Sequence, residues 1–238
     1  MEVITVRCRA DNLAYLAYRA GARQCLVIDP GEAGPVLAAL QQHALEPECV
    51  LATHAHADHT AGAAEIGRRT GAAMRRLAPG RDRALDWSGG RLSVLHVPGH
   101  TPEHVAFHDA EGEALFCGDV LFVAGCGRAA SGCMTDLWHS LLRLAELPDS
   151  TRVFPGHDYT AENLAFAAHL DPSDQRVAER WSRAQSGDAL VPSTIGEEKR
   201  TNPFLRCADP AYRARIGRGG LTPEVCFAQL RELKNRWS

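Results

Sequence analysis

The sequence lacks any apolar run that approaches the roughly 18 residues of a membrane-spanning helix. Its first seven residues lack the charged start, the apolar stretch and the small-residue cleavage site of a secretory signal. Internal repeats and low-complexity tracts are missing as well. The chain has 238 residues, of which 45% are hydrophobic. That composition suits a globular protein with a sizeable core, and we expect a cytoplasmic protein without a membrane partner.

The sequence also lacks an excess of positive charge. Lys and Arg number 26, and Asp and Glu number 29, which gives a formal net charge of −3. The isoelectric point is about 6.4. This balance argues against a broad basic surface of the kind that binds a nucleic-acid backbone. We therefore expect no nucleic-acid partner.

Closely spaced cysteine pairs are missing too, since the sequence contains no C-x-x-C. An even number of cysteines leaves a disulfide framework as the alternative. Wide spacing in a chain without an export signal favours reduced, buried thiols, and these are what we expect. The eight cysteines are Cys8, Cys25, Cys49, Cys117, Cys126, Cys133, Cys207 and Cys226.

Short apolar runs broken by Gly and Pro predict a sheet-rich domain over residues 1–165. Its predicted strands are 13–19, 24–29, 49–53, 92–97, 105–107, 114–117 and 151–155, and its predicted helices are 35–45, 60–69 and 135–147. Helical patterns then dominate, at 160–170, 173–186 and 223–236, with a polar stretch at 191–206 that we expect to be irregular. We therefore predict a second, helical domain over residues 166–238.

One segment carries an unusual density of metal-binding side chains. The predicted strand 49–53 leads directly into His54, His56, Asp58 and His59. Three imidazoles and a carboxylate are the donors that Zn²⁺, Fe²⁺ and Mn²⁺ accept. In an extended segment, His54 and His56 point the same way. A turn after His56 would direct Asp58 and His59 toward a second metal.

Three more candidates follow predicted strands. They are His100, Asp119 and His157, and each comes directly after a glycine, which lets the backbone approach a metal closely. Each dipeptide alone is a weak signal, and a lone His-x-His is common. Their repetition after successive strands predicts a metal site along one edge of a sheet.

Together these motifs resemble the signature of the metallo-β-lactamase superfamily. The resemblance implies an α/β fold of the α+β type, the four-layer αββα sandwich, with a dinuclear metal site. One metal would take His54, His56 and His100, and the other would take Asp58, His59 and His157. Asp119 and a hydroxide would bridge them. We expect two divalent ions, zinc first, with iron and manganese as alternatives.

Finer segments resemble the glyoxalase II (hydroxyacylglutathione hydrolase) family. The segments that carry this resemblance are 11–12, 121–128, 154–164 and 192–206. The resemblance implies a C-terminal helical substrate-binding domain and hydrolysis of S-(2-hydroxyacyl)glutathione, such as S-D-lactoylglutathione, in methylglyoxal detoxification. Asp58 and Asp119 would orient the attacking hydroxide. We expect a monomer, with a small-molecule glutathione thioester bound by Arg128, Tyr159, Lys199 and Arg206.

Other readings of the sequence stay open. Ala129 and Ala130 follow Arg128 where the family often has aromatic residues, so a different thiol carrier is an alternative. Asp158 after His157 also resembles the persulfide dioxygenases, which use one iron held by two histidines and one aspartate. A lactonase, another thioesterase and a non-catalytic binding module on the same scaffold are further alternatives.

Overall fold

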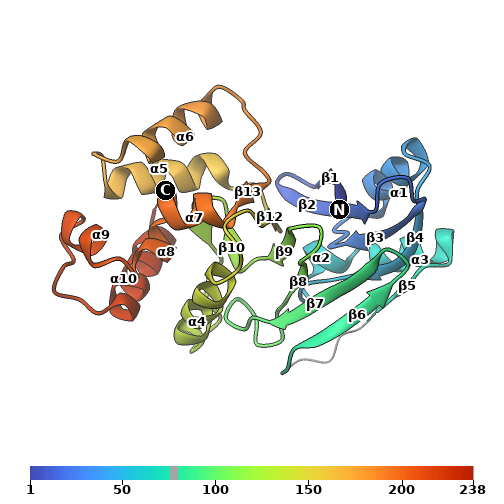
Figure 1. Ribbon diagram of the computed structural model, residues 1–238, viewed down its shortest axis with the longest axis horizontal. Helices are drawn as coiled ribbons and strands as arrows, with labels where there is room; N and C mark the ends of the chain where they lie inside the picture. The colour runs from blue at the N-terminus through green and yellow to red at the C-terminus, as the bar shows by residue number, and fades with distance from the viewer. Residues whose placement is uncertain (76–79, 238) are drawn as a thin grey trace. The chain divides into compact units, whose positions relative to one another are not determined.

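The computed structural model describes residues 1–75 and 80–237 and divides the chain into two compact units. The first unit consists of Met1–His96, Glu103–Gly118 and Pro155–Asp158. The second consists of Val97–Pro102, Asp119–Phe154 and Tyr159–Ser238. Figure 1 labels the helices and strands of both units. The boundary predicted near residue 165 stays a prediction.

The first unit contains a five-stranded sheet in the order β1-β2-β3-β4-β5. Its strands are β1 (Glu2–Cys8), β2 (Asn12–Tyr18), β3 (Gln24–Ile28), β4 (Glu46–Leu51) and β5 (Ala73–Met74). The pairs β1–β2 and β2–β3 are antiparallel, whereas β3–β4 and β4–β5 are parallel. Because β3 and β4 are parallel, their carboxyl ends lie at the same edge of the sheet. That edge leads into the His54 segment.

Two helices, α1 (Ala33–Gln42) and α3 (Ala63–Thr70), pack against this sheet. The single turn α2 (Ala57–Thr60) comes shortly before α3. The buried side chains of α1 and α3, among them Val36 and Ile66, join those of the strands in one core cluster. A helix was predicted over 60–69; the structure instead has two short helices, separated at Gly62, where a Cβ atom would collide with the backbone of Pro30 and Glu32.

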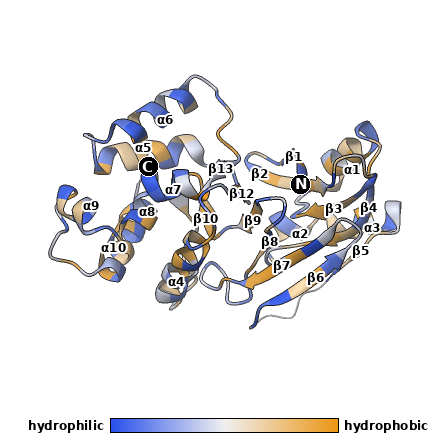
Figure 2. Ribbon diagram, in the orientation of Figure 1, coloured by the Kyte–Doolittle hydropathy of each residue, from blue (hydrophilic) through white to orange (hydrophobic). Residues whose placement is uncertain are grey.

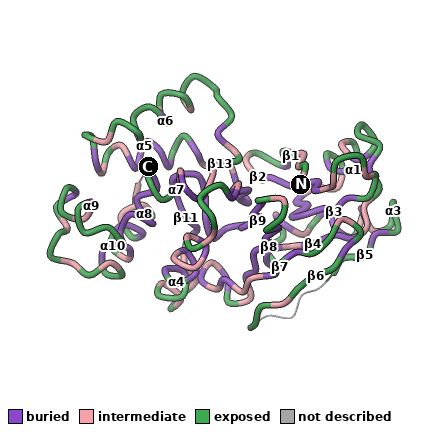
Figure 3. The backbone as a smooth tube through the Cα atoms, viewed as in Figure 1, coloured by how far each residue is buried: buried purple, intermediate pink, exposed green. Residues whose placement is uncertain are grey.

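The first unit also contains four antiparallel strands: β6 (Arg83–Trp87), β7 (Gly90–His96), β8 (Val105–Asp109) and β9 (Ala114–Gly118). In Figure 3, β8 and β9 are purple, and every residue in them is buried. The rings of Tyr15 on β2 and Phe116 on β9 pack with their centroids 5.5 Å apart. Two sheets therefore share an apolar interior in this unit.

The second unit is mainly helical. Its helices are α4 (Met134–Ala145), α5 (Thr160–Leu170), α6 (Gln175–Gln185), α7 (Ile195–Thr201), α8 (Pro203–Arg206), α9 (Pro210–Arg215) and α10 (Pro223–Asn235). Its short strands pair as β10 (Leu121–Phe122) with β11 (Gly125–Cys126) and β12 (Arg152–Pro155) with β13 (Ser193–Thr194). Figure 2 shows the mainly hydrophilic colour of α6, which buries Val177 against Leu164 of α5.

The expectation that residues 191–206 are irregular was wrong, because they form β13, α7 and α8. A capping box starts α7: the Thr194 hydroxyl accepts from the Glu197 backbone N–H, and the Glu197 carboxylate accepts from the Thr194 backbone N–H. Asn202 then caps α8, with Pro203 at its first position. These are recognised helix-start signals. The polar composition of the stretch concealed them.

Two further expectations can be compared with the structure. All eight cysteines are free thiols, and the predicted burial holds for all of them except Cys133. No helix within residues 1–75 and 80–237 is long and apolar enough to cross a membrane.

Candidate metal centre

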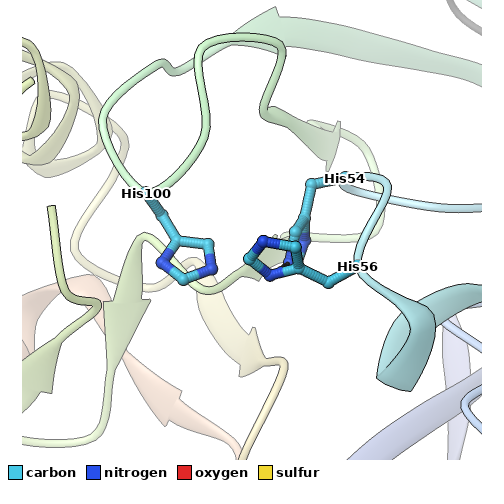
Figure 4. Close-up of side chains that lie close together, drawn as sticks. All are labelled: His54, His56 and His100. Carbon is cyan, nitrogen blue, oxygen red and sulfur yellow. Dashed lines mark hydrogen bonds between the residues drawn. The ribbon is translucent and has the colours of Figure 1, made fainter. Parts of the chain in front are cut away.

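The segment after β4 adopts the shape that its histidine spacing predicts. Strand β4 ends at Leu51, and His56 is extended (φ −60°, ψ 144°) before α2 begins at Ala57. Nε2 of His54 therefore lies 2.9 Å from Nδ1 of His56. Figure 4 shows these two imidazoles on the segment after β4 and labels His100 on its loop. Both rings present nitrogen atoms to one point, as two ligands of one ion would.

The start of α2 supplies a second group of donors. Asp58 and His59 lie on its single turn, and the donor atoms of Asp58, His59 and His157 all lie within 4.8 Å of one another. Oδ2 of Asp58 is 3.8 Å from Nε2 of His59 and 3.4 Å from Nε2 of His157. One ion could contact all three residues. The turn predicted after His56 thus gathers Asp58 and His59, as expected.

Residues 11–12 position His157. The backbone N–H of Leu13 donates to the Gly156 carbonyl at 2.9 Å, and that of Asp158 donates to the Asp11 carbonyl at 3.0 Å. The carboxylate of Asp11 then lies 2.8 Å from Nδ1 of His157. Since a carboxylate accepts, Nδ1 carries the proton and Nε2 faces Asp58. The sequence drew attention to residues 11–12 only through the family resemblance.

Asn12 holds the Asp58 carboxylate. Its Nδ2 lies 3.1 Å from both the backbone oxygen and Oδ2 of Asp58. Partial burial alone would raise the pKa of Asp58, but the Asn12 hydrogen bond and the charges of His59 and His157 outweigh it. The pKa of the Asp58 carboxyl is therefore lowered, which favours the ionised form that binds a metal.

The second unit carries the two other predicted ligands. Nε2 of His100 lies 3.5 Å from Oδ2 of Asp119. Nδ1 of His100 lies 3.0 Å from the Arg128 carbonyl, so that nitrogen donates and Nε2 faces Asp119. Gly99 has a φ of +141°, and a Cβ atom on it would collide with Leu137. Glycine is therefore favoured at this position by the backbone conformation and by the closeness of Leu137, whereas the expected close approach to a metal stays a prediction.

The donor chemistry fits divalent metal ions. His59, His100 and His157 each have a carboxylate or backbone carbonyl within hydrogen-bonding distance of Nδ1 and direct Nε2 toward an aspartate. Such a partner typically fixes the ring of a metal-ligating histidine. Nitrogen and carboxylate oxygen together suit zinc, iron and manganese. The donor atoms of these side chains are therefore of the types that bind the predicted divalent metal ions.

The predicted substrate contacts have varied surroundings. Lys199 is exposed and forms an ion pair with Asp149 at 2.8 Å. Arg206 is buried and forms an ion pair with Asp174 at 2.7 Å, with its guanidinium over the Tyr212 ring. Tyr159 packs edge-on against Phe122, and Arg128 is exposed. The roles of these four side chains in substrate binding stay predictions.

The sequence analysis did not identify two cationic side chains of α10, Arg231 and Lys234, as candidates. Nη1 of Arg231 donates to the Cys126 carbonyl at 2.7 Å and lies 3.4 Å from the Gly127 carbonyl, so it holds the segment before Arg128. Burial lowers the pKa of Lys234, and the charges of Arg231 and Arg128 lower it further against the opposing effect of Glu162. Arg128 and Arg231 therefore both act electrostatically on Lys234, and we call these three side chains the cation cluster. Their wide separation in sequence gave no motif.

Two family models match successive parts of the chain. Residues 11–78 and 75–157 match the family model "Metallo-beta-lactamase superfamily", and residues 158–237 match "Hydroxyacylglutathione hydrolase C-terminus". A relative from Methylococcus capsulatus named hydroxyacylglutathione hydrolase is 40% identical over 251 residues, which cover 99% of this chain and 98% of that protein.

Two solved structures resemble most or nearly all of the chain. ETHE1 from Myxococcus xanthus is 26% identical, with a TM-score of 0.67, over 98% of this chain and 90% of its own. TTHA1623, solved in a di-iron-bound form, is 29% identical, with a TM-score of 0.62, over 86% of this chain and 100% of its own. These likenesses confirm the fold class predicted from the motifs.

Proposed function

The chain belongs to the hydroxyacylglutathione hydrolase family of the metallo-beta-lactamase superfamily, and we propose that it hydrolyses S-(2-hydroxyacyl)glutathione thioesters. S-D-lactoylglutathione would give D-lactate and glutathione. The observation that carries the proposal is the group of Asp58, His59 and His157, with each histidine oriented by a carboxylate. A hydrolase needs such fixed ligands to activate water at neutral pH.

The His/Asp cluster and the superfamily together indicate that the chain binds divalent metal. We propose two ions, with zinc first and iron or manganese as alternatives; the di-iron form of TTHA1623 supports the number. The proposed ligands are His54, His56, Asp58, His59, His100, Asp119 and His157. When bound, the ions would lower the pKa of a water molecule and polarise the thioester carbonyl.

The ligand carboxylates have a distinct role in this proposal. Asp58 would hold its ion and orient the attacking water, and Asp119 would do the same from the second unit. A general base must be able to take up a proton near neutral pH. The lowered pKa of Asp58 makes its carboxylate a poor proton acceptor there, so a ligand role suits it better.

The cation cluster is the proposed site for the glutathione carboxylates. Arg128 extends from the segment that Arg231 holds, and Lys234 shares their electrostatic environment. Charge-assisted hydrogen bonds to a carboxylate would stabilise the bound thioester and relieve the repulsion among the three cations. Tyr159 could add a hydroxyl. Lys199 and Arg206 stay weaker candidates because Asp149 and Asp174 already bind them.

The test is a hydrolysis assay without oxygen. Metal-replete protein is incubated anaerobically with S-D-lactoylglutathione, and the loss of thioester absorbance is followed. We expect hydrolysis by the wild type and little or none by His56→Ala. A metal-loaded wild type that leaves the thioester intact would refute the proposal. Oxygen consumption with glutathione persulfide would then identify the dioxygenase alternative.

Partner and location complete the proposal. A small-molecule thioester is the partner that the family name supports. A monomeric state, a cytoplasmic location and the lack of nucleic-acid or membrane partners remain proposals that rest on composition. Sedimentation of the purified protein would test the first of these directly.

A further inference from the structure

Asp29 lies next to the segment that carries His54 and His59, two of the proposed metal ligands. It directly follows β3, is almost fully buried, and has a left-handed backbone conformation with φ of +51°. Aspartate tolerates this region better than most residues do. Its backbone N–H donates to the carbonyl of Leu51, the last residue of β4. The carboxylate is therefore fixed at the point where two parallel strands end.

The Asp29 carboxylate accepts three hydrogen bonds. Oδ1 accepts from the Thr53 backbone N–H at 2.7 Å, and Oδ2 accepts from the Thr53 hydroxyl at 2.8 Å. Nδ1 of His59 lies 3.1 Å from the same Oδ2. An ionised carboxylate can only accept, so Nδ1 of His59 carries the proton. In the neutral form of the ring, which is the form that binds a metal, the lone pair is then on Nε2, the atom that faces Asp58.

The Thr53 hydroxyl connects the Asp29 carboxylate to a second imidazole ring, that of His54. This hydroxyl has one proton, which it gives to Asp29. Nδ1 of His54 lies 3.1 Å from this hydroxyl oxygen, so the oxygen can only accept from it. His54 therefore also carries its proton on Nδ1. Its Nε2 lone pair is directed toward His56, 2.9 Å away.

Packing holds Thr53 and His54 in this arrangement. Gly118 has a φ of +48°, and a Cβ atom on it would collide with the Thr53 side chain. The ring of His104 stacks on that of His54, with centroids 4.8 Å apart and planes 18° apart. The Thr53 hydroxyl consequently has little room to turn away from Asp29.

We propose that Asp29 is a positioning residue that sets the tautomer of two metal-ligating histidines, His59 directly and His54 through Thr53. This inference rests on the metal site of the proposed function. The family resemblance assigns His54 and His59 to different ions. One buried carboxylate would then prepare both metal positions, and its loss would weaken both.

An isosteric substitution tests this directly. In Asp29→Asn, the Thr53 backbone N–H still needs an acceptor, so the side-chain oxygen of the asparagine takes the place of Oδ1. The amide NH₂ group then takes the place of Oδ2. That group donates to Nδ1 of His59 and moves the ring proton to Nε2, where it blocks ligation. The Thr53 hydroxyl loses its acceptor and donates to Nδ1 of His54, which blocks that ring as well. Thr53→Val removes only the hydroxyl that connects Asp29 to His54, and it leaves the contact between Asp29 and His59 in place.

Two readouts that do not depend on activity follow these changes. Long-range ¹H–¹⁵N spectra of the metal-free protein report which nitrogen of each ring is protonated. Cobalt titration, followed by its visible absorption, reports each binding step. We expect Nδ1–H tautomers for both rings of the wild type. We expect affinity to fall about 10- to 100-fold at both metals in Asp29→Asn and at one metal in Thr53→Val.

Controls separate positioning from general destabilisation. Thr53→Ser keeps the hydroxyl and should restore both binding steps. Asp109→Asn removes another fully buried carboxylate of the first unit, which pairs with Arg19 at 2.7 Å, and should leave the tautomers unchanged. Should Asp29→Asn fail to fold, the wild-type spectra and Thr53→Val still decide.

The outcomes distinguish the two proposals. An Nε2–H tautomer for His54 or His59 in the wild type would overturn the inference, and so would wild-type cobalt affinity in Asp29→Asn. A wild type with both predicted tautomers and two bound metals, but without thioester hydrolysis, would overturn the proposed function alone.

Discussion

Two proposed metal-ligand histidines of the first unit and two cations of the second unit are held in different ways. In the first unit, His59 and His157 are nearly inaccessible to solvent, and carboxylates fix both rings. In the second unit, Arg128 is exposed, and Arg231 binds backbone carbonyls instead of acids. Rigid, buried ligands suit the chemical step, whereas side chains with a net excess of positive charge suit the recognition of an anionic substrate. We therefore expect substitutions of the ligands to alter kcat and substitutions of the cations to alter KM.

Among the changes that we predict, the loss of a metal ligand should have the largest effect on activity. We expect His59→Ala to lower kcat by about 1,000-fold, because the ion and the stabilisation it offers the oxyanion are lost together. Metal analysis and steady-state kinetics measure both effects. His139→Ala, an exposed histidine of α4, is the control and should keep full activity. Equal activity in the two variants would show that His59 is not a ligand.

A buried ion pair supports the second unit, and its loss should destabilise the fold. The Glu198 carboxylate accepts from Arg180 at 3.1 Å, from the Ala124 backbone N–H at 2.7 Å and from Asn202 at 3.0 Å. Glu198→Ala leaves the buried Arg180 charge without this partner. We expect a loss of about 3–5 kcal/mol in the free energy of unfolding.

Urea unfolding measures this loss. Glu179→Ala on the exposed face of α6 is the control, and its effect should stay within about 0.5 kcal/mol. Similar midpoints for the two variants would contradict the assigned role of Glu198. Because residues 192–206 include Glu198 and Asn202, the experiment also tests whether this segment supports the loop at Ala124.

The next change concerns binding alone. We expect Lys234→Ala to raise KM for the glutathione thioester about 10-fold with kcat nearly unchanged, since a charged hydrogen bond contributes about 1.5–3 kcal/mol. Arg183→Ala, which removes an exposed ion pair with Asp188, serves as control. A fall in kcat without a change in KM would place Lys234 in the chemical step instead.

The same lysine predicts a pH dependence. Burial and the charges of Arg231 and Arg128 lower the pKa of Lys234 below 10.5, its ordinary value. The side chain therefore loses its charge at a lower pH than an exposed lysine does. We expect KM to rise with pH before pH 10.5 is reached, and this rise should disappear in Lys234→Ala. A rise that persists in the variant would assign the titration to another group.

Sequence reasoning is strongest where the signal is local. Four predicted ligands lie between His54 and His59, and the strand predicted before them at 49–53 is found slightly earlier, at Glu46–Leu51. Asp29 and Lys234 were missed because their partners are distant in the chain: Asp29 bonds Thr53, 24 residues later, and no motif links Lys234 to Arg128. Only the folded chain brings such residues together. The helix α7 was missed for a different reason, since its capping box lies in a polar stretch.

The smallest expected effect concerns acid stability. Burial of Asp171 would raise its pKa, but hydrogen bonds from Ser173 and Arg215 lower it overall. Asp171 therefore contributes stability above its unfolded pKa of about 3.9, and that contribution is lost as pH falls through the lower folded value. Because Arg215 is partly exposed, we expect Asp171→Asn to cost under about 1 kcal/mol at neutral pH. Thermal unfolding at pH 7 and pH 3 should show a smaller difference between variant and wild type at the lower pH.

The most direct test of the account is a metal titration of the metal-free protein, with glutathione thiol released from S-D-lactoylglutathione as the readout. The account predicts that the initial rate rises until about two equivalents of zinc are bound and that His59→Ala shows no such rise. A wild type that binds two equivalents without releasing thiol, or that reaches its full rate at one equivalent, would contradict the account of a two-metal thioesterase.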